Sequence, residues 1–162
     1  MKQQDSEMPG ENLGSHTLSF SVNGEKFEHH RQYISGAEIR KTGNVPDSEH
    51  IYLEVKEPWE DEPVPDEKEI DLARPGQEHF YSHPKEVKIF VEGKPHPWDK
   101  PKISFEEVII LAYGKYIDKP TMTYTVAYED GPKQNPEDSL YKEQKVFVKN
   151  KMIFHATAAD KS

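Results

Sequence analysis

The chain has 162 residues, of which 33% are hydrophobic, 31% charged and 10% aromatic, and its formal net charge is −9. This length fits one ordinary domain or two small ones, and the aromatic content argues against disorder throughout the chain. Without cysteine there are no disulfides, thiolate metal sites or cysteine nucleophiles, and no apolar run is long enough for a transmembrane helix. Because the opening stretch MKQQDSEMPGENLGS lacks the apolar core of a secretory signal, we expect a cytoplasmic protein.

The charge is divided unevenly along the chain. Residues 17–84 carry 15 acidic and 7 basic side chains, a net charge of −8, whereas residues 85–162 carry 12 acidic and 13 basic ones, a net charge of +1. The acidic half would repel nucleic acids and anionic membranes. All 13 basic residues of the second half are lysines, although arginine is the usual residue for forked phosphate contacts. We therefore expect neither nucleic acid nor membrane as a partner.

The first part of the chain predicts a disordered segment and then a small domain of strands and one helix. We expect disorder over residues 1–16 and a first domain over residues 17–82. Alternating apolar residues over 18–22 predict a half-buried strand, and the turn NGEK leads into a second strand through Phe27. Three further strands are predicted after the helix, at 51–55, 69–72 and 78–81.

The helix of this domain has clear end signals. Ser35 and Glu38 have the Ser-x-x-Glu spacing of a capping box, in which each residue binds a backbone N–H of the other. Ile34 lies where a hydrophobic staple would pack, and Gly43 is a natural helix stop.

An acidic, proline-rich insert, EPWEDEPVPDEKE, occupies residues 57–69. We favour a solvated, mobile loop, and the alternative is a docking element that binds a basic surface through Trp59. The pair His29–His30 makes a poor chelate, because adjacent strand residues point to opposite faces. We interpret both as surface histidines and expect no metal site and no cofactor.

The second part of the chain repeats the first at a constant offset. Phe20, Val22 and Gly24 correspond to Ile89, Val91 and Gly93, at a spacing of 69 residues. The same offset relates the first helix start to Ile103, Ser104, Glu107 and Val108. A constant offset through two different patterns indicates a repeat, so we predict a second domain over residues 85–162, joined to the first near residues 82–85.

The second copy predicts the same elements in the same order. Residues 87–91 alternate as a strand, a return strand passes through Trp98, and a helix follows Ser104 and ends at Gly114. Its inward face is expected to comprise Val108, Leu111 and Ala112. Residues 122–128 alternate strictly, and two more strands are predicted at 145–149 and 152–157.

This order of elements predicts an α+β fold, with two tandem β-grasp domains. Each domain would hold a mixed sheet of about four strands crossed by one helix. The first and last strands of each copy can pair in parallel at the centre, since the helix supplies the long crossover that parallel pairing needs.

The second copy resembles bacterial multi-ubiquitin-type domains. The segments that carry the resemblance are IFVEGKPHPW, ISFEEVIILAYG, YTVAYEDGP, NPEDSL and VKNKMIFHATAADKS. They cover most of residues 86–162, and the first copy is similar through its VNG turn, its helix start and the motif PGQEHF. The resemblance implies a ubiquitin-like modifier of a bacterial ubiquitination-like operon, some of which are linked to antiphage defence. It also implies an adenylating activating enzyme, a conjugating-enzyme-like protein and a deconjugating metallopeptidase as partners.

By this resemblance, the last residues of the chain are the conjugation or processing tail. We expect the last strand to end near Thr157 and to leave a tail of Ala158, Ala159, Asp160, Lys161 and Ser162. Most ubiquitin-like modifiers end in two glycines, whereas the last glycine here is Gly131. Three interpretations stay open: direct use of Ser162, trimming to Ala159 or Ala158, or no conjugation. A further alternative is a disordered terminus without a task.

A partner surface is predicted on the outer face of the second sheet. If Phe154 and Ala156 face the core, Ile153 and His155 alternate outward, and Phe90 and Phe147 do the same in their own strands. Exposed apolar groups of this kind would form a binding patch. The alternative is a register shifted by one residue, which would place these side chains in the core.

The sequence carries no enzyme signature. There is no P-loop, no G-x-S-x-G and no H-E-x-x-H, and we expect no catalysis. The leading hypothesis is a tandem ubiquitin-like protein modifier whose acidic first domain tunes partner choice. The alternative is a non-conjugated tandem binding module or adaptor. A third interpretation, a structural repeat within a larger assembly, predicts stable oligomers.

Overall fold

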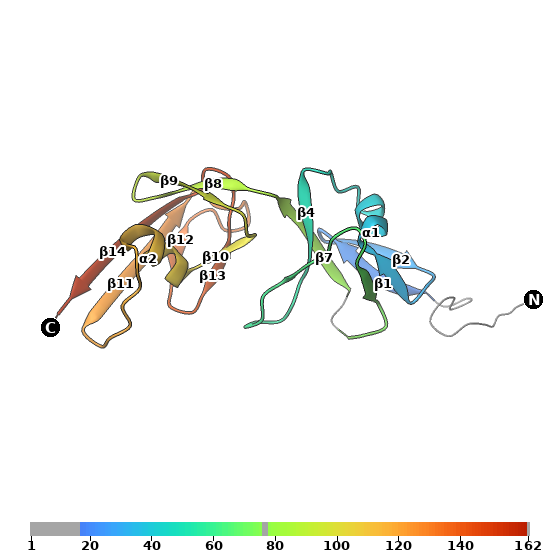
Figure 1. The fold of residues 1–162 in the computed structure, drawn as a ribbon, viewed down its shortest axis with the longest axis horizontal. Coiled ribbons are helices and arrows are strands. Elements are labelled where there is room, and N and C mark those ends of the chain that lie inside the picture. The colour runs from blue at the N-terminus through green and yellow to red at the C-terminus, as the bar shows by residue number, and fades with distance from the viewer. Residues whose placement is uncertain (1–16, 76–77, 162) are drawn as a thin grey trace, which may run out of the picture. The chain divides into compact units, whose positions relative to one another are not determined.

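The computed structural model of the chain describes residues 17–75 and 78–161 (Figure 1). The chain divides into two compact units between Pro84 and Lys85. The disorder predicted for residues 1–16 lies outside the described residues. Neither helix in the described ranges is long and apolar enough to cross a membrane.

The first unit is a five-stranded mixed sheet with one helix. The sheet has the order β2-β1-β7-β4-β5, and β3 and β6 form a separate two-stranded sheet. Strand β1 pairs in parallel with β7, and the other pairs are antiparallel. The elements are β1 (Leu18–Val22), β2 (Glu25–His29), β3 (Tyr33–Ser35), α1 (Gly36–Thr42), β4 (Glu49–Leu53), β5 (Glu62–Pro63), β6 (Glu69–Asp71) and β7 (His79–Pro84).

The second unit repeats this plan. Its five-stranded sheet has the order β12-β11-β14-β8-β9, and β10 pairs with β13 in a separate two-stranded sheet. Strand β14 pairs in parallel with β8 and antiparallel with β11. The elements are β8 (Val87–Val91), β9 (Lys94–Trp98), β10 (Lys102–Ser104), α2 (Phe105–Tyr113), β11 (Met122–Glu129), β12 (Asp138–Leu140), β13 (Lys145–Phe147) and β14 (Ile153–Asp160).

The predicted α+β architecture of two tandem β-grasp domains is confirmed. In each unit the first and last strands pair in parallel inside the sheet, as expected for a helix-containing crossover. The expected number of about four strands in each sheet was too low, because the short strands β5 and β12 pair through only a few residues each. Strands this short give almost no alternating pattern in the sequence.

Both hairpins at the start of the units have the same tight turn. Asn23 and Gly24 have φ angles of 53° and 85°, and Glu92 and Gly93 have φ angles of 50° and 79°. Two consecutive positive φ angles are typical of the type I′ turn, whose twist matches that of the flanking strands. The second turn residue is glycine in both copies, because glycine adopts positive φ without steric cost.

Both predicted capping boxes are present. In α1 the Glu38 N–H donates to Ser35 Oγ at 3.1 Å, and the Ser35 N–H donates to Glu38 Oε1 at 2.9 Å. In α2 the Glu107 N–H donates to Ser104 Oγ at 3.0 Å, and the Ser104 N–H donates to Glu107 Oε1 at 2.9 Å. These bonds fix where each helix leaves the preceding strand.

The two helices end at the predicted glycines for different reasons. Gly114 follows α2 with a φ of 86°, a left-handed conformation that favours glycine. Gly43 follows α1 with ordinary backbone angles, but a Cβ there would lie 2.5 Å from the Val22 side chain. Close packing of the helix end on β1 therefore requires glycine at this position.

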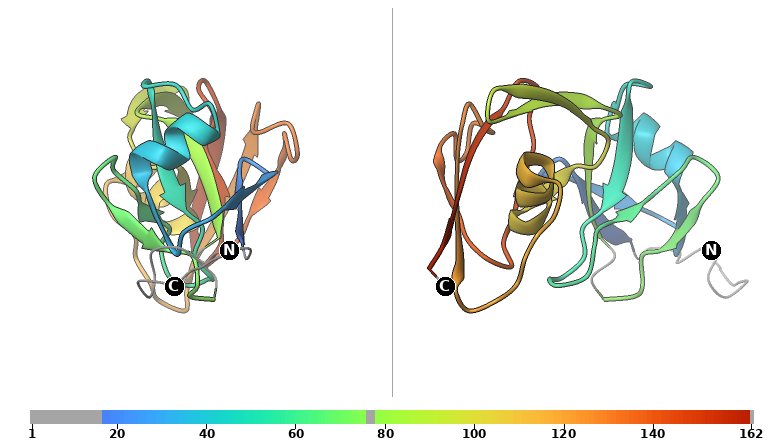
Figure 2. Two further views of the ribbon diagram at one scale, coloured as in Figure 1. Left: turned by 90° about the vertical axis from the view of Figure 1, so that its right-hand side faces the viewer. Right: turned by 60° about the vertical axis from the view of Figure 1, so that its left-hand side comes forward.

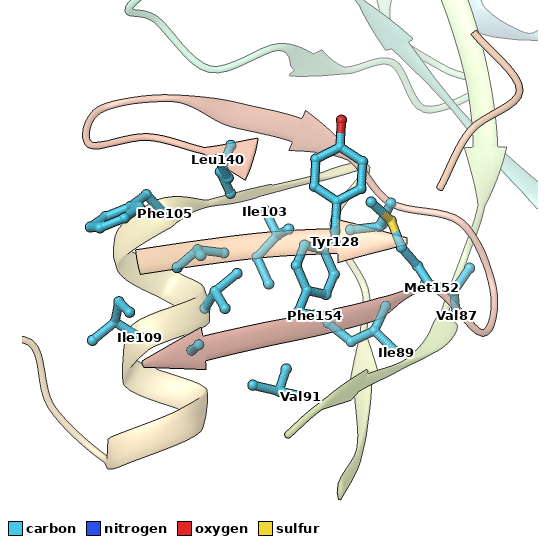
Figure 3. Close-up of a cluster of buried hydrophobic side chains, with 14 residues drawn as sticks. Val87, Ile89, Val91, Ile103, Phe105, Ile109, Tyr128, Leu140, Met152 and Phe154 are labelled. Carbon is cyan, nitrogen blue, oxygen red and sulfur yellow. The ribbon is translucent and has the colours of Figure 1, made fainter. Parts of the chain in front are cut away.

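The core of the second unit lies between α2 and the sheet (Figure 3). The predicted inward helix face was only partly correct. Val108 is fully buried, whereas Leu111 and Ala112 are partly buried and pack at the edge of the core. Phe105 and Ile109 complete the buried face, so the buried residues of α2 follow the i, i+3, i+4 spacing of one helix face from Phe105 onward.

We expect Ser104→Ala to lower the free energy of unfolding of the second unit by about 1 kcal/mol, since the helix loses its N-cap acceptor. Ser104→Thr is the matched control and should stay near the wild type, because the hydroxyl is retained. Urea unfolding in a Trp59→Phe background reads this unit alone through Trp98, the one remaining tryptophan of the two in the sequence. Equal stability of the alanine and threonine variants would contradict the capping role.

Candidate functional site

Three residues of the predicted tail, Ala158, Ala159 and Asp160, lie within the last strand and not beyond it. Strand β14 continues through residues 158–160, so the expectation that it ends near Thr157 was wrong. After the strand, the Lys161 N–H donates to the Thr121 carbonyl at 2.9 Å. Ser162 lies outside the described residues.

The tail residues pair with the start of β11, as the two strands in Figure 2 show. The ion pair between Lys119 Nζ and Asp160 Oδ2, at 3.0 Å, holds the end of this ladder. Alanine has a low strand propensity, so the local sequence at Ala158 and Ala159 predicts no strand. Pairing with β11, which is distant in the sequence, overrides this local preference. The pairs are Ala158 with Tyr124, Ala159 with Thr123 and Asp160 with Met122.

The opposite edge of β14 is open over this stretch. Strand β8 pairs with β14 only at Ile153 and Phe154, and then reverses in the turn at Glu92. Beyond Ala156, β14 therefore has β11 on one side and no strand on the other within residues 17–75 and 78–161. Among the described residues, Ala158 and Ala159 therefore lie in a strand that has a neighbouring strand on one edge only.

The outer face of the sheet brings three of the four predicted partner residues together. Phe90 and Ile153 are opposite each other across the β8–β14 pair, and both are half-buried. His155 is exposed and its Nε2 lies 2.7 Å from the Glu129 carboxylate. Phe154 is fully buried, so the alternation along β14 agrees with the predicted register.

Phe147 does not belong to this face. It lies in β13, which pairs with β10 outside the five-stranded sheet. Its ring is 40% exposed, and the Lys102 ammonium lies over it at 4.7 Å from the ring centroid. The prediction assumed that all apolar strand residues of the second half share one sheet, and the short β10–β13 ladder breaks that assumption.

The acidic insert is anchored at its base, contrary to the expectation of a mobile loop throughout. Strand β5 pairs with β4, and Val64 is buried in the core. The Asp61 carboxylate accepts from the Val55 N–H at 2.8 Å and from the Tyr81 hydroxyl. Burial, together with this bond to Asp61, raises the pKa of the Tyr81 phenol. Trp59, near the start of the insert, remains 71% exposed.

A groove of about 730 Å³ lies on the second unit beside β11 and β12. Its walls include Tyr116, Tyr124 and Leu140, so it is largely apolar. Asp118 and Lys142, also at the groove, pair with each other at 3.2 Å, and this hydrogen bond raises the pKa of Lys142. A groove lined mainly by apolar and aromatic side chains, with a few charged groups, is typical of a ligand-binding surface.

The histidines make no chelating site in the described part of the chain. His29 Nε2 bonds the Tyr33 carbonyl at 3.0 Å, and His30 is exposed. No group of three or more potential metal ligands occurs among residues 17–75 and 78–161.

Comparison with known proteins identifies a family for both units. A family model described as Multiubiquitin matches two consecutive segments of the chain, residues 18–85 and 87–160. The two segments together span most of the sequence. No match was found among curated proteins or among solved structures.

The assignment of the two sheet faces makes a clear prediction. We expect Phe154→Ala to destabilise the second unit by about 3–5 kcal/mol or to unfold it, because Phe154 fills the core. Phe90→Ala, on the neighbouring strand but on the outer face, should cost only about 1 kcal/mol. Urea unfolding in the Trp59→Phe background, followed through Trp98, measures both variants. Similar costs for the two variants would show that the register is wrong.

Proposed function

The chain belongs to the multiubiquitin family, and on that premise we propose that it is a ubiquitin-like protein modifier of a bacterial ubiquitination-like pathway. Its last segment, residues 158–162, is the part on which the pathway acts. The proposed partners are an adenylating activating enzyme, a conjugating-enzyme-like protein and a deconjugating metallopeptidase. The proposed setting is cytoplasmic, in an operon of antiphage defence, and the chain itself performs no catalysis.

The family match over both units is the observation that carries this proposal. The position of the small residues supports it. Ala158 and Ala159 are exposed and lie two and three residues after Ala156, the last buried residue of the last strand. An activating enzyme must take a carboxylate into a narrow site, and alanine has the smallest side chain available in this segment. Trimming to Ala159 or Ala158 would place such a residue at the new end.

The segment must leave β11 before it can enter such a site. This detachment requires little free energy, because residues 157–160 are all exposed and bury no side chain in the core. The cost is a few backbone hydrogen bonds at the end of a ladder and the exposed ion pair of Asp160 with Lys119. Strand ends of this kind open locally without unfolding the domain.

The first unit serves partner recognition in this proposal. Its net charge of −8 over residues 17–84 would guide a basic partner surface. The exposed Trp59 extends from the anchored insert and offers an apolar contact within this acidic surface.

A second candidate function is a non-conjugated tandem binding module. The observation that favours it is the pairing of Ala158, Ala159 and Asp160 with β11, which keeps the segment inside the sheet. Under this alternative the outer face with Phe90 and Ile153, or the apolar groove beside β11, binds partners without any covalent step.

Intact mass measurement with the reconstituted partner enzymes and ATP distinguishes the two functions. The modifier predicts an ATP-dependent adduct or a trimmed chain with the wild type. Ala159→Tyr should reduce this product at least about tenfold, because a bulky side chain cannot pass a narrow site. Thr123→Tyr is the matched control, since Thr123 lies directly opposite Ala159 on β11 and is also exposed.

The control variant should react like the wild type. Binding of the activating enzyme without any covalent product in the wild type would support the binding module instead. Equal loss of product in both tyrosine variants would show that strand distortion, and not passage of the segment, limits the reaction.

A further inference from the structure

Two side chains bind the peptide groups on either side of Ala156 in the last strand. The Ala156 N–H donates to Glu92 Oε2 at 2.7 Å. The Tyr113 hydroxyl, from the end of α2, donates to the Ala156 carbonyl at 3.0 Å. Ala156 is itself 2% exposed. Both its N–H and its C=O are therefore bound by side chains from other elements.

The Glu92 side chain supplies the hydrogen-bond acceptor that a backbone carbonyl would supply if β8 continued. Its own N–H still bonds the Phe154 carbonyl at 3.1 Å, which continues the parallel ladder of β8 and β14. Residue 92 then turns away with a φ of 50°, so its carbonyl cannot accept the next N–H of β14. The carboxylate accepts that N–H instead and extends the ladder by one bond.

The first unit contains the same arrangement. Asn23, at the equivalent turn position, has a φ of 53° and donates its N–H to the Phe80 carbonyl at 2.9 Å. Its side-chain Oδ1 accepts the Ser82 N–H at 2.9 Å. A neutral amide accepts the backbone N–H of the last strand in the first unit, and a carboxylate accepts it in the second. The position therefore requires a hydrogen-bond acceptor and not a charge.

The anchoring of β14 changes abruptly after Ala156. Up to this residue the strand is bound on both edges, and every second side chain is buried. Residues 157–160 have β11 on one edge, and all four are exposed. We expect an abrupt change of this kind to divide the strand into two parts. The end of the strand opens locally, whereas the part before it opens only when the whole domain unfolds.

We propose that residues 157–160 form a releasable segment and that Ala156 is its fixed boundary. Glu92 and Tyr113 are the positioning residues that hold Ala156 in the sheet. Detachment of β14 from β11 begins at Asp160 and stops at Thr157. The inference rests on the proposed function, for which it sets how much chain is presented to a processing or activating site. It places Ala158 and Ala159 inside the releasable segment and keeps His155 in the sheet.

Hydrogen exchange measured by NMR on the full chain tests this boundary. The Lys161 N–H donates to Thr121, and hydrogen-bonded positions alternate along antiparallel strands, so the amides of His155, Thr157 and Ala159 face β11. In the wild type, Thr157 and Ala159 should exchange much faster than His155. In Glu92→Ala, His155 should exchange about tenfold faster, because one hydrogen bond that holds β14 next to the open segment is lost.

Two further variants complete the experiment. Glu92→Gln retains an acceptor, as Asn23 does in the first unit, and should keep the wild-type exchange rate at His155. Tyr113→Phe removes only the hydroxyl and should speed His155 exchange in the same direction as Glu92→Ala. It provides the test if the alanine variant does not fold.

Equal exchange rates at His155 and Thr157 in the wild type would overturn the proposal. So would an unchanged rate at His155 in a folded Glu92→Ala variant together with an unchanged rate in Tyr113→Phe. The experiment uses no partner enzyme. A boundary at Ala156 with no covalent product in the mass measurement would therefore refute the modifier function and leave the boundary intact.

Discussion

Parallel pairing between the first and last strand of each unit is the constraint on which the rest of the structure depends. Parallel strands cannot be joined by a tight turn, so the chain between them must cross the sheet, and here the crossing includes the helix. The last strand is thereby placed inside the sheet, with a neighbour on each side. The capping box at the start of each helix and the glycine at its end then set where the helix begins and ends along this crossing.

The same constraint shapes the segment on which the proposed function depends. The first strand turns back into its hairpin, so its pairing with the last strand ends at the turn. The strand on the other side, β11, begins at Met122, and its pairing with β14 therefore extends as far as Asp160. The small residues are thus exposed without being free of the sheet. A modifier of this design would expose its reactive segment by opening a strand end, which links its chemistry to local stability.

Local patterns predicted much of this fold, and long-range pairing accounts for what they missed. The hairpin turns and both capping boxes depend on residues close in sequence, such as Ser104 and Glu107, and the structure agrees with them. The strand at Ala158 and the separate sheet around Phe147 depend on partners far along the chain. The acceptor role of Glu92 has a weak signal in hindsight, since Asn23 occupies the same position in the first copy.

The central claim is that the last segment of the chain is chemically processed or joined to a target. The most direct measurement is the intact mass of the protein recovered from its native cells, with peptide mapping of residues 152–162. The account predicts chains shortened within residues 158–162, or chains that carry a covalent adduct at the new end. An unmodified segment through Ser162 in every recovered molecule would contradict it and would favour the binding module.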